Sequence, residues 1–454
     1  MEMNIMKTPT KTTNMETGSI PKLLAQLAIP AVVAQVINLL YNIVDRIYIG
    51  HIPGIGAAAL TGVGLFTPIL MLLNAFAMLV GSGGAPRAAI AMGKKDNDLA
   101  EKILGNCFTL LVGLAVVLTI VFYVSAPTLL RLFGASDATL TYATDYARIY
   151  ILGSFFVLIV LGMNTFITTQ GFAKISMMTT IIGAVINIIL DPVLIFGLGP
   201  FPKMGIEGAA LATGIGQAAG AVLYLIFYIV NPLPVKYRKK YLKADLKLWK
   251  KLYVIGIPAS LNLALPSLLI SVLNVILTGY GEVYVFVLGV YYKLQTFLYL
   301  PANGIVQGMR PLLGYNYGAG EHKRVHKIFQ DGLILVIVMM AAGMAICLAV
   351  PGQLMGLFTA NPITMKAGSV ALRVISLGFL ASSVSVICSG ALEGLGKGVH
   401  SLIISLCRYV VVIIPVAFIV SRFMGAVGVW HAFWITEVVT AVIAYVVYRK
   451  GVKG

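Results

Sequence analysis

Apolar stretches of about 20 residues recur along the whole chain, separated by short turns rich in Gly and Pro. A helix of roughly 20 apolar residues is long enough to cross a bilayer. Twelve such stretches are present, at 21–49, 57–82, 102–126, 145–169, 176–198, 206–230, 251–279, 284–308, 328–350, 368–391, 399–420 and 426–448. The connections between them are too short for a separate soluble domain. The pattern predicts an all-α polytopic membrane protein with twelve transmembrane helices.

Composition agrees with this prediction. Of the 454 residues, 59% are hydrophobic and 11% are charged, against about 25% charged in soluble domains. The net charge of +17 does not indicate nucleic-acid binding, because the basic residues lie in short loops between apolar stretches. Membrane lipids are therefore expected partners, and nucleic acid is not. The four cysteines have no metal-ligand or disulfide spacing.

The loops alternate in charge along the chain. The even-numbered connections are basic, most clearly the segment 236–251, whereas the odd-numbered ones contain few Lys or Arg. Cytoplasmic loops of membrane proteins carry the excess of basic residues. Both termini and the central linker are therefore expected in the cytoplasm. The polar first 19 residues lack the apolar core of a cleavable signal peptide.

The chain also contains an internal repeat. The segment that starts at Pro86 aligns with the one that starts at Pro311, 225 residues later. Six crossings return a chain to the same side, so the repeat predicts two six-helix halves of the same orientation. Parallel repeats of this kind are a transporter architecture. We expect tails at 1–20 and 450–454, six-helix bundles at 21–230 and 251–449, and a basic linker at 231–250.

The first predicted helix carries polar residues in an apolar context. They recur at helical spacing and form one stripe; its members are Gln35, Asn38, Asn42 and Asp45. A carboxylate inside a spanning helix costs roughly 2.5–3.5 kcal/mol and usually faces a cavity or a bundle interior. The alternative is an acid at a helix end, paired with the adjacent Arg46. Pro30 precedes the stripe and removes a backbone hydrogen bond, so a bend is expected there.

Further polar residues lie on the fourth, fifth and sixth predicted helices. They form pairs four residues apart, on one helix face each: Asn187 with Asp191, Asn164 with Thr168, and Thr213 with Gln217. Two carboxylates in a low-dielectric site do not both stay ionised without a cation. Either one of them takes up a proton or Na⁺ bridges them, and the sequence leaves both options open.

The second half has no matching acids, because Leu273 and Ile414 stand at the positions equivalent to Asp45 and Asp191. Its charges within apolar stretches include Lys293, Arg408 and Glu437. Lys293, near Gln295, is either a gating residue or one that extends to the membrane surface. Glu437 could line a cavity, but it lacks the neighbouring oxygen ligands of the first half.

The motifs resemble those of the multidrug and toxic compound extrusion (MATE) transporters, especially prokaryotic members similar to MepA and DinF, over about residues 20–449. The resemblance rests on YNIVDRIYIG at Tyr41, GSGGAPRAAIAMGKKD at Gly81, NTFITTQG at Asn164, NIILDPVLIFG at Asn187, GIEGAALAT at Gly205 and GMRPLLGYNYGAG at Gly308. It implies a first-half cation or proton site at Asp45, Asn187 and Asp191. Related polar positions match Asn38, Tyr146, Asn164 and Thr213. Second-half acids of some members are replaced here by Pro266 and Ser382.

The resemblance implies an antiporter in a prokaryotic plasma membrane that exports bulky, often cationic compounds in exchange for H⁺ or Na⁺. A flippase for a lipid-linked precursor is the alternative, although such proteins usually line their cavity with several Arg and Lys. A membrane enzyme is disfavoured, because no nucleophile, metal or nucleotide motif is present. Without a nucleotide site, an ion gradient would drive transport. We expect a monomer, and no cofactor besides the coupling ion.

Overall fold

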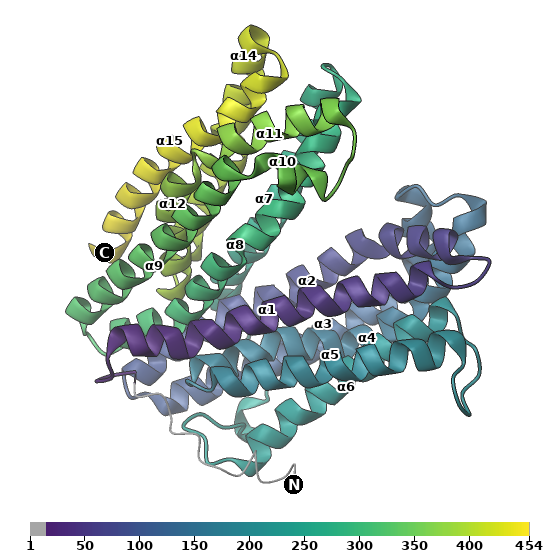
Figure 1. Ribbon diagram of the computed structural model, residues 1–454. Helices are drawn as coiled ribbons and strands as arrows, with labels where there is room; N and C mark the ends of the chain where they lie inside the picture. Colours follow the sequence, from purple (N-terminus) through teal and green to yellow (C-terminus); the bar gives the residue numbers. More distant parts are fainter. Residues whose placement is uncertain (1–14, 454) are drawn as a thin grey trace. The chain divides into compact units, whose positions relative to one another are not determined.

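The computed structural model describes residues 15–453, which are helical apart from short connections (Figure 1). Most of the predicted N-terminal tail lies outside the described residues. The α-helices are α1 (Ile20–Gly50), α2 (Gly56–Gly93), α3 (Asn97–Leu132), α4 (Asp137–Thr169), α5 (Ala173–Phe196), α6 (Ile206–Val230), α7 (Leu246–Thr278), α8 (Glu282–Gly318), α9 (His322–Ala349), α10 (Pro351–Gly356), α11 (Pro362–Ser376), α12 (Phe379–Gly394), α13 (Gly398–Leu406), α14 (Ile413–Met424) and α15 (Ala426–Lys453). Two shorter helices are η2 (Lys239–Tyr241), a 3₁₀ turn, and η3 (Cys407–Val411), a π-helical turn.

The predicted number of spans is confirmed. Within residues 15–453, eleven helices or continuous helical segments are long and apolar enough to cross a membrane, and the pair α11 and α12 supplies a twelfth. This last span is bent by 55°, whereas no break was expected in the apolar stretch 368–391. The break lies at Gly378, where a Cβ would come within 2.9 Å of the backbone of Trp434 on α15. Only glycine allows α15 to pack this closely at the bend.

The chain divides into two compact units. Among the described residues, unit 1 contains 15–17 and 33–256, and unit 2 contains 18–32 and 257–453. Both α1 and α7 therefore change unit part-way along their length, within three residues of Pro30 in α1 and of Pro258 in α7. The first helix of each predicted half thus begins in one unit and continues in the other.

In unit 1, α4 is the central helix and packs against α2, α3, α5 and α6 (Figure 1). Two glycine pairs bring the backbones together. Gly153 on α4 faces Gly214 on α6, and Gly183 on α5 faces Gly216 on α6. Small residues are enriched where membrane helices approach closely, since lipid supplies no hydrophobic driving force between them. The second glycine pair fixes the position of α5 relative to α6, which matters for the site below.

The basic linker is part of unit 1, where it packs along α3. Asn106 accepts from the backbone N–H of Asp245 at 2.8 Å and donates to the carbonyl of Tyr241 at 3.1 Å. Lys102 forms a 2.8 Å ion pair with Asp245, and the buried Glu101 pairs with Arg238. The linker is therefore a fixed element of unit 1 and leads directly into α7.

In unit 2, α12 is the central helix and packs against α8, α9, α13 and α15. The helices α13, η3 and α14 together form one continuous span, Gly398–Met424. The π-helical turn η3 interrupts its regular α-helical hydrogen bonding. This turn places Arg408 in a buried position.

Candidate functional site

Asp45 is the buried member of the polar stripe on α1. Its side chain is 7% exposed, and its Oδ1 has no hydrogen-bond partner. The adjacent Arg46 is exposed, and no ion pair joins the two side chains in the part of the chain that the structure describes. This geometry disfavours the interpretation of Asp45 as a helix-end acid neutralised by Arg46.

The other polar residues of the stripe are less buried. Gln35 and Asn38 are half-buried, and Nε2 of Gln35 has no partner. Asn42 is exposed and donates to the backbone carbonyl of Asn38 at 2.6 Å. The stripe therefore faces partly outward, and only Asp45 reaches the interior of unit 1.

Asn187 and Asp191 meet Thr213 between α5 and α6. Nδ2 of Asn187 donates to Oδ1 of Asp191 at 3.3 Å and to Oγ1 of Thr213 at 3.2 Å. Asp191 is fully buried, Asn187 is 2% exposed and Thr213 is 6% exposed. The close approach of Gly216 to Gly183 brings α6 against the backbone of Asn187, one turn further along α5. The structure thus brings together three residues that the sequence had placed on two separate helices.

Three buried oxygen atoms of this site have no hydrogen-bond donor. They are Oδ1 of Asp45, Oδ1 of Asn187 and Oδ2 of Asp191. The two carboxyl groups also lie near enough to repel each other when both are ionised. An unpaired buried acceptor is costly, and an unpaired buried charge costs more. A proton or a hard cation such as Na⁺ would satisfy these oxygens, since both bind carboxylate and amide oxygen.

Aromatic side chains form one wall of the site. Tyr146 and Tyr150 of α4 stack with ring centroids 5.7 Å apart, and both contact the ring of Phe66 edge-on. Tyr146 interacts electrostatically with Asp45 and Asp191. Only Tyr146 was expected here, from the resemblance. Its i, i+4 spacing to Tyr150 is the sequence signal that could have indicated the second ring.

Some expected ligands lie elsewhere or remain without a partner. Asn164 joins α4 to the start of α5, since it donates to the carbonyl of Ser176 at 3.2 Å and accepts from Thr179 at 3.4 Å. Thr168 donates to the backbone of its own helix at 3.4 Å. Gln217 is half-buried on α6. The expectation that Asn164 supplies a ligand next to Asp191 is therefore not supported, because its amide is engaged about three to four helical turns earlier on α5.

Comparison with known proteins assigns the chain to a family. A sequence model of the MatE family matches residues 30–193 and, a second time, residues 258–419. The chain belongs to the MATE transporter family. Because one family model matches both halves, it supports the internal repeat, and the two matches begin at Pro30 and Pro258.

Individual MATE-family proteins resemble the chain over nearly its full length. The multidrug export protein MepA of Staphylococcus haemolyticus is 27% identical over 438 residues, 95% of this chain and 94% of that protein. A solved MATE structure in a bent conformation is 25% identical with a TM-score of 0.90, and 98% of each chain is covered. A MOP superfamily transporter from Pyrococcus furiosus has the same fold, with a TM-score of 0.89, 24% identity and 98% coverage of both chains.

In unit 2 of this MATE protein, the predicted cavity residues are arranged differently from the site of unit 1. Lys293 is exposed, with its ammonium group 5.9 Å from the centroid of the Phe358 ring. Gln295 is half-buried. Glu437 forms a buried ion pair with Arg408, a partner that the sequence analysis did not expect. Two opposite charges in the last two apolar stretches were the signal for this pair.

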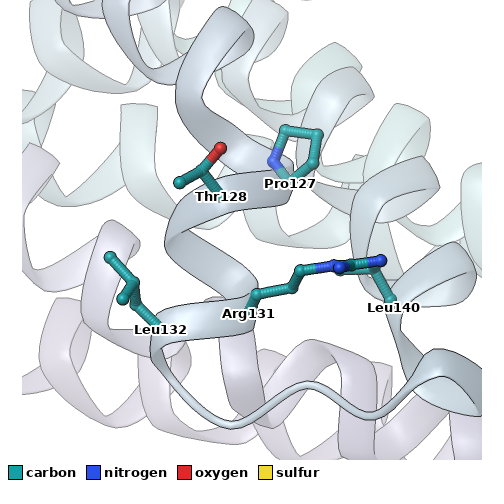
Figure 2. A pocket seen from close by; sticks show the side chains of 5 residues that line it. All are labelled: Pro127, Thr128, Arg131, Leu132 and Leu140. Atoms are coloured by element: carbon teal, nitrogen blue, oxygen red, sulfur yellow. The ribbon is translucent and has the colours of Figure 1, made fainter.

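A cavity of about 520 Å³ also lies between the end of α3 and the start of α4, lined by Pro127, Thr128, Arg131, Leu132 and Leu140. Figure 2 shows these five side chains around it. None of the predicted site residues lines this cavity. Arg131 is engaged there with Asp137 at 3.5 Å. The cavity belongs to the helix ends and not to the carboxylate site.

Proposed function

We propose that the chain is a secondary-active efflux antiporter, which exports amphipathic and often cationic compounds in exchange for H⁺ or Na⁺. The observation that carries the proposal is the set of three buried oxygens without donors, on Asp45, Asn187 and Asp191. Such a set suits an ion that binds in one state and leaves in another. Multidrug export is the activity that the name of the MepA relatives states.

The burial of charged groups favours the antiporter over the flippase. The described part of the chain contains five buried charged residues: Asp45, Glu101, Asp191, Glu393 and Arg408. Four of these five are acids. A cavity for a pyrophosphate-linked lipid would need several cations, whereas unit 1 offers two acids that could serve a coupling ion or an organic cation.

The mechanism follows from competition for one set of carboxylates. An ion at Asp45 and Asp191 stabilises one arrangement of unit 1, and its release favours another. A ligand shifts such an equilibrium only by its differential affinity for the two arrangements. Tenfold antagonism between ion and drug corresponds to about 1.4 kcal/mol of coupling, and linkage makes this coupling reciprocal. With the linker in the cytoplasm, drug release would face the opposite side.

The experiment is ethidium transport by the purified chain in liposomes, driven by an imposed proton gradient or sodium gradient. We expect one gradient to drive transport in the native chain. Asp45→Asn and Asp191→Asn should abolish the dependence on that gradient without loss of folded protein, since removing a buried charge relieves a desolvation cost. Asp137→Asn is the matched control, because the Asp137 side chain is 99% exposed. Transport by Asp45→Asn with unchanged ion dependence would refute the proposed coupling site.

A further inference from the structure

Unit 2 contains a buried ion pair that the proposed coupling site does not use. Nε of Arg408 donates to Oε1 of Glu437 at 2.8 Å, and Nη2 lies 2.6 Å from the same oxygen. The exposed fractions of the two side chains are 10% and 13%. Oε2 of Glu437 accepts only a long hydrogen bond, 3.4 Å, from Ser385. A buried ion pair in a membrane span is costly, and function is the usual reason for its presence.

The position of Arg408 depends on the π-helical turn η3. Pro415 has no N–H and cannot donate to the carbonyl of Val411. The backbone instead forms an i, i+5 bond, in which the N–H of Val412 donates to the carbonyl of Cys407 at 3.0 Å. Such π-helical turns are rare and frequently occur at functional sites. Here the turn directs a guanidinium group inward on a span that is mostly apolar.

The guanidinium retains donor capacity. Arginine has five N–H donors in a planar fork that matches a carboxylate. Two of them are directed to a single oxygen of Glu437, and a third makes a 3.5 Å contact with the hydroxyl of Tyr409. Arg408 can therefore hold a second acceptor.

Tyrosine side chains lie near the ion pair. The ring of Tyr291 lies 5.3 Å from that of Tyr292 and 5.4 Å from that of Phe433, measured between centroids. The hydroxyl groups of Tyr292 and Thr436 are buried without a hydrogen-bond partner. A flat ligand with polar substituents would pack against such aromatic rings and form hydrogen bonds with such hydroxyl groups.

The two partners of the ion pair differ in their acid–base chemistry. Arginine cannot lose its charge in a protein, whereas a carboxylate can take up a proton. The groups that face Glu437 are Arg408 and the tyrosines at 291, 292 and 299. Tyrosine titrates near pH 10 in water. Glu437 is therefore the group of this cluster that can take up a proton when another anion competes for Arg408. Once Glu437 is protonated, Arg408 is left without its anion.

We propose that Arg408 binds the carboxylate group of an aromatic ligand, which replaces Glu437 as Glu437 takes up a proton. The proton comes from the solvent and the ligand arrives ionised, so the net charge of the site stays the same before and after binding. This inference concerns unit 2 and is independent of the proposed coupling site in unit 1.

The test is binding of 1-naphthoate to the full chain in detergent, between pH 5.5 and 8. Methyl 1-naphthoate serves as the uncharged probe of equal ring size. We expect the affinity for 1-naphthoate to rise up to about tenfold for each unit that the pH falls, as one linked proton requires. Calorimetry in two buffers of different ionisation enthalpy should show about one proton taken up per ligand. Equal binding of the ester, or binding without proton uptake, would overturn the proposal.

Variants of Glu437 and Arg408 test the role of each partner on its own. Glu437→Gln imitates the protonated acid, so it should bind 1-naphthoate at least tenfold more tightly at pH 8 and without pH dependence. Arg408→Gln should lose binding at every pH. Arg422→Gln is the matched control, because Arg422 is an exposed arginine of the same span. Weaker binding by folded Glu437→Gln would contradict the exchange. If Glu437→Gln does not fold, the measured proton uptake by the native chain still tests the exchange.

Decanoate tests the preference for an aromatic ligand. It should compete for the site at least tenfold more weakly than 1-naphthoate, and equal competition would overturn the aromatic specificity.

Discussion

Asn187 and Asp191 lie one turn apart on α5, and one amide group joins the acid to Thr213 on the neighbouring helix. The Asn187 Nδ2 atom donates to both side chains, over 3.3 and 3.2 Å. This arrangement turns Oδ1 of Asn187 away from both partners and leaves it without a donor. The amide therefore acts as an orienting group, which directs one oxygen toward the site that the two carboxylates share.

The role of Thr213 can be tested by removing its acceptor. Thr213→Val should free the amide of Asn187 to rotate and weaken ion binding. A hydrogen bond contributes about 1 kcal/mol net, so we expect the half-saturating ion concentration for transport to rise about fivefold. Thr213→Ser retains the hydroxyl and should behave like the native protein. An unchanged ion requirement in Thr213→Val would show that the amide needs no such support.

The ion pair of unit 2 predicts a loss of stability in Glu437→Gln. Removing one partner leaves a buried guanidinium without a counter-ion, at a cost of about 3 kcal/mol. The melting temperature should fall, and the double variant Arg408→Gln, Glu437→Gln should recover part of the loss. A saturating concentration of 1-naphthoate should raise the melting temperature of the single variant, because a ligand stabilises the state it binds.

The same variant tests the asymmetry between the halves. Glu437→Gln should impair ion-driven efflux less than Asp191→Asn, because the three oxygens without donors lie in unit 1. The measurement is the ethidium flux per folded protein in liposomes. Equal loss in both variants would mean that the two units share one coupling site.

The linker offers a prediction on pH. The hydrogen bond from Lys102, and next the backbone N–H of Leu248, lower the pKa of Asp245 below its ordinary value of 3.8. A carboxyl with a lowered pKa stabilises the fold above its ordinary value, and this contribution disappears as the pH falls through the folded-state value. Asp245→Asn should therefore speed amide hydrogen exchange in the linker at pH 7. Below pH 3.8, the difference in exchange rate between Asp245→Asn and the native protein should shrink.

Pro30 provides a conformational prediction. The proline leaves the carbonyl of Gln26 without its helical donor, and α1 changes from unit 2 to unit 1 two residues further on. Pro30→Ala should restore this bond and stiffen α1, which slows turnover severalfold while drug affinity stays within about twofold. Single-turnover and equilibrium binding measurements distinguish the two quantities. A loss confined to affinity would place Pro30 in drug binding and not in bending.

The sequence by itself determined the membrane spans and the local pairs on each helix. Apolar length and helical spacing are properties of consecutive residues, so twelve spans, the α1 stripe and the Asn187–Asp191 pair could be read directly. Tertiary structure decided which helices meet and how each is rotated. Close approach at Gly216 brings Thr213 to Asn187, the π-helical turn brings Arg408 to Glu437, and Asn164 is held at Ser176 instead of Asp191. These contacts depend on how neighbouring helices pack and rotate against one another, which periodicity along one helix does not encode.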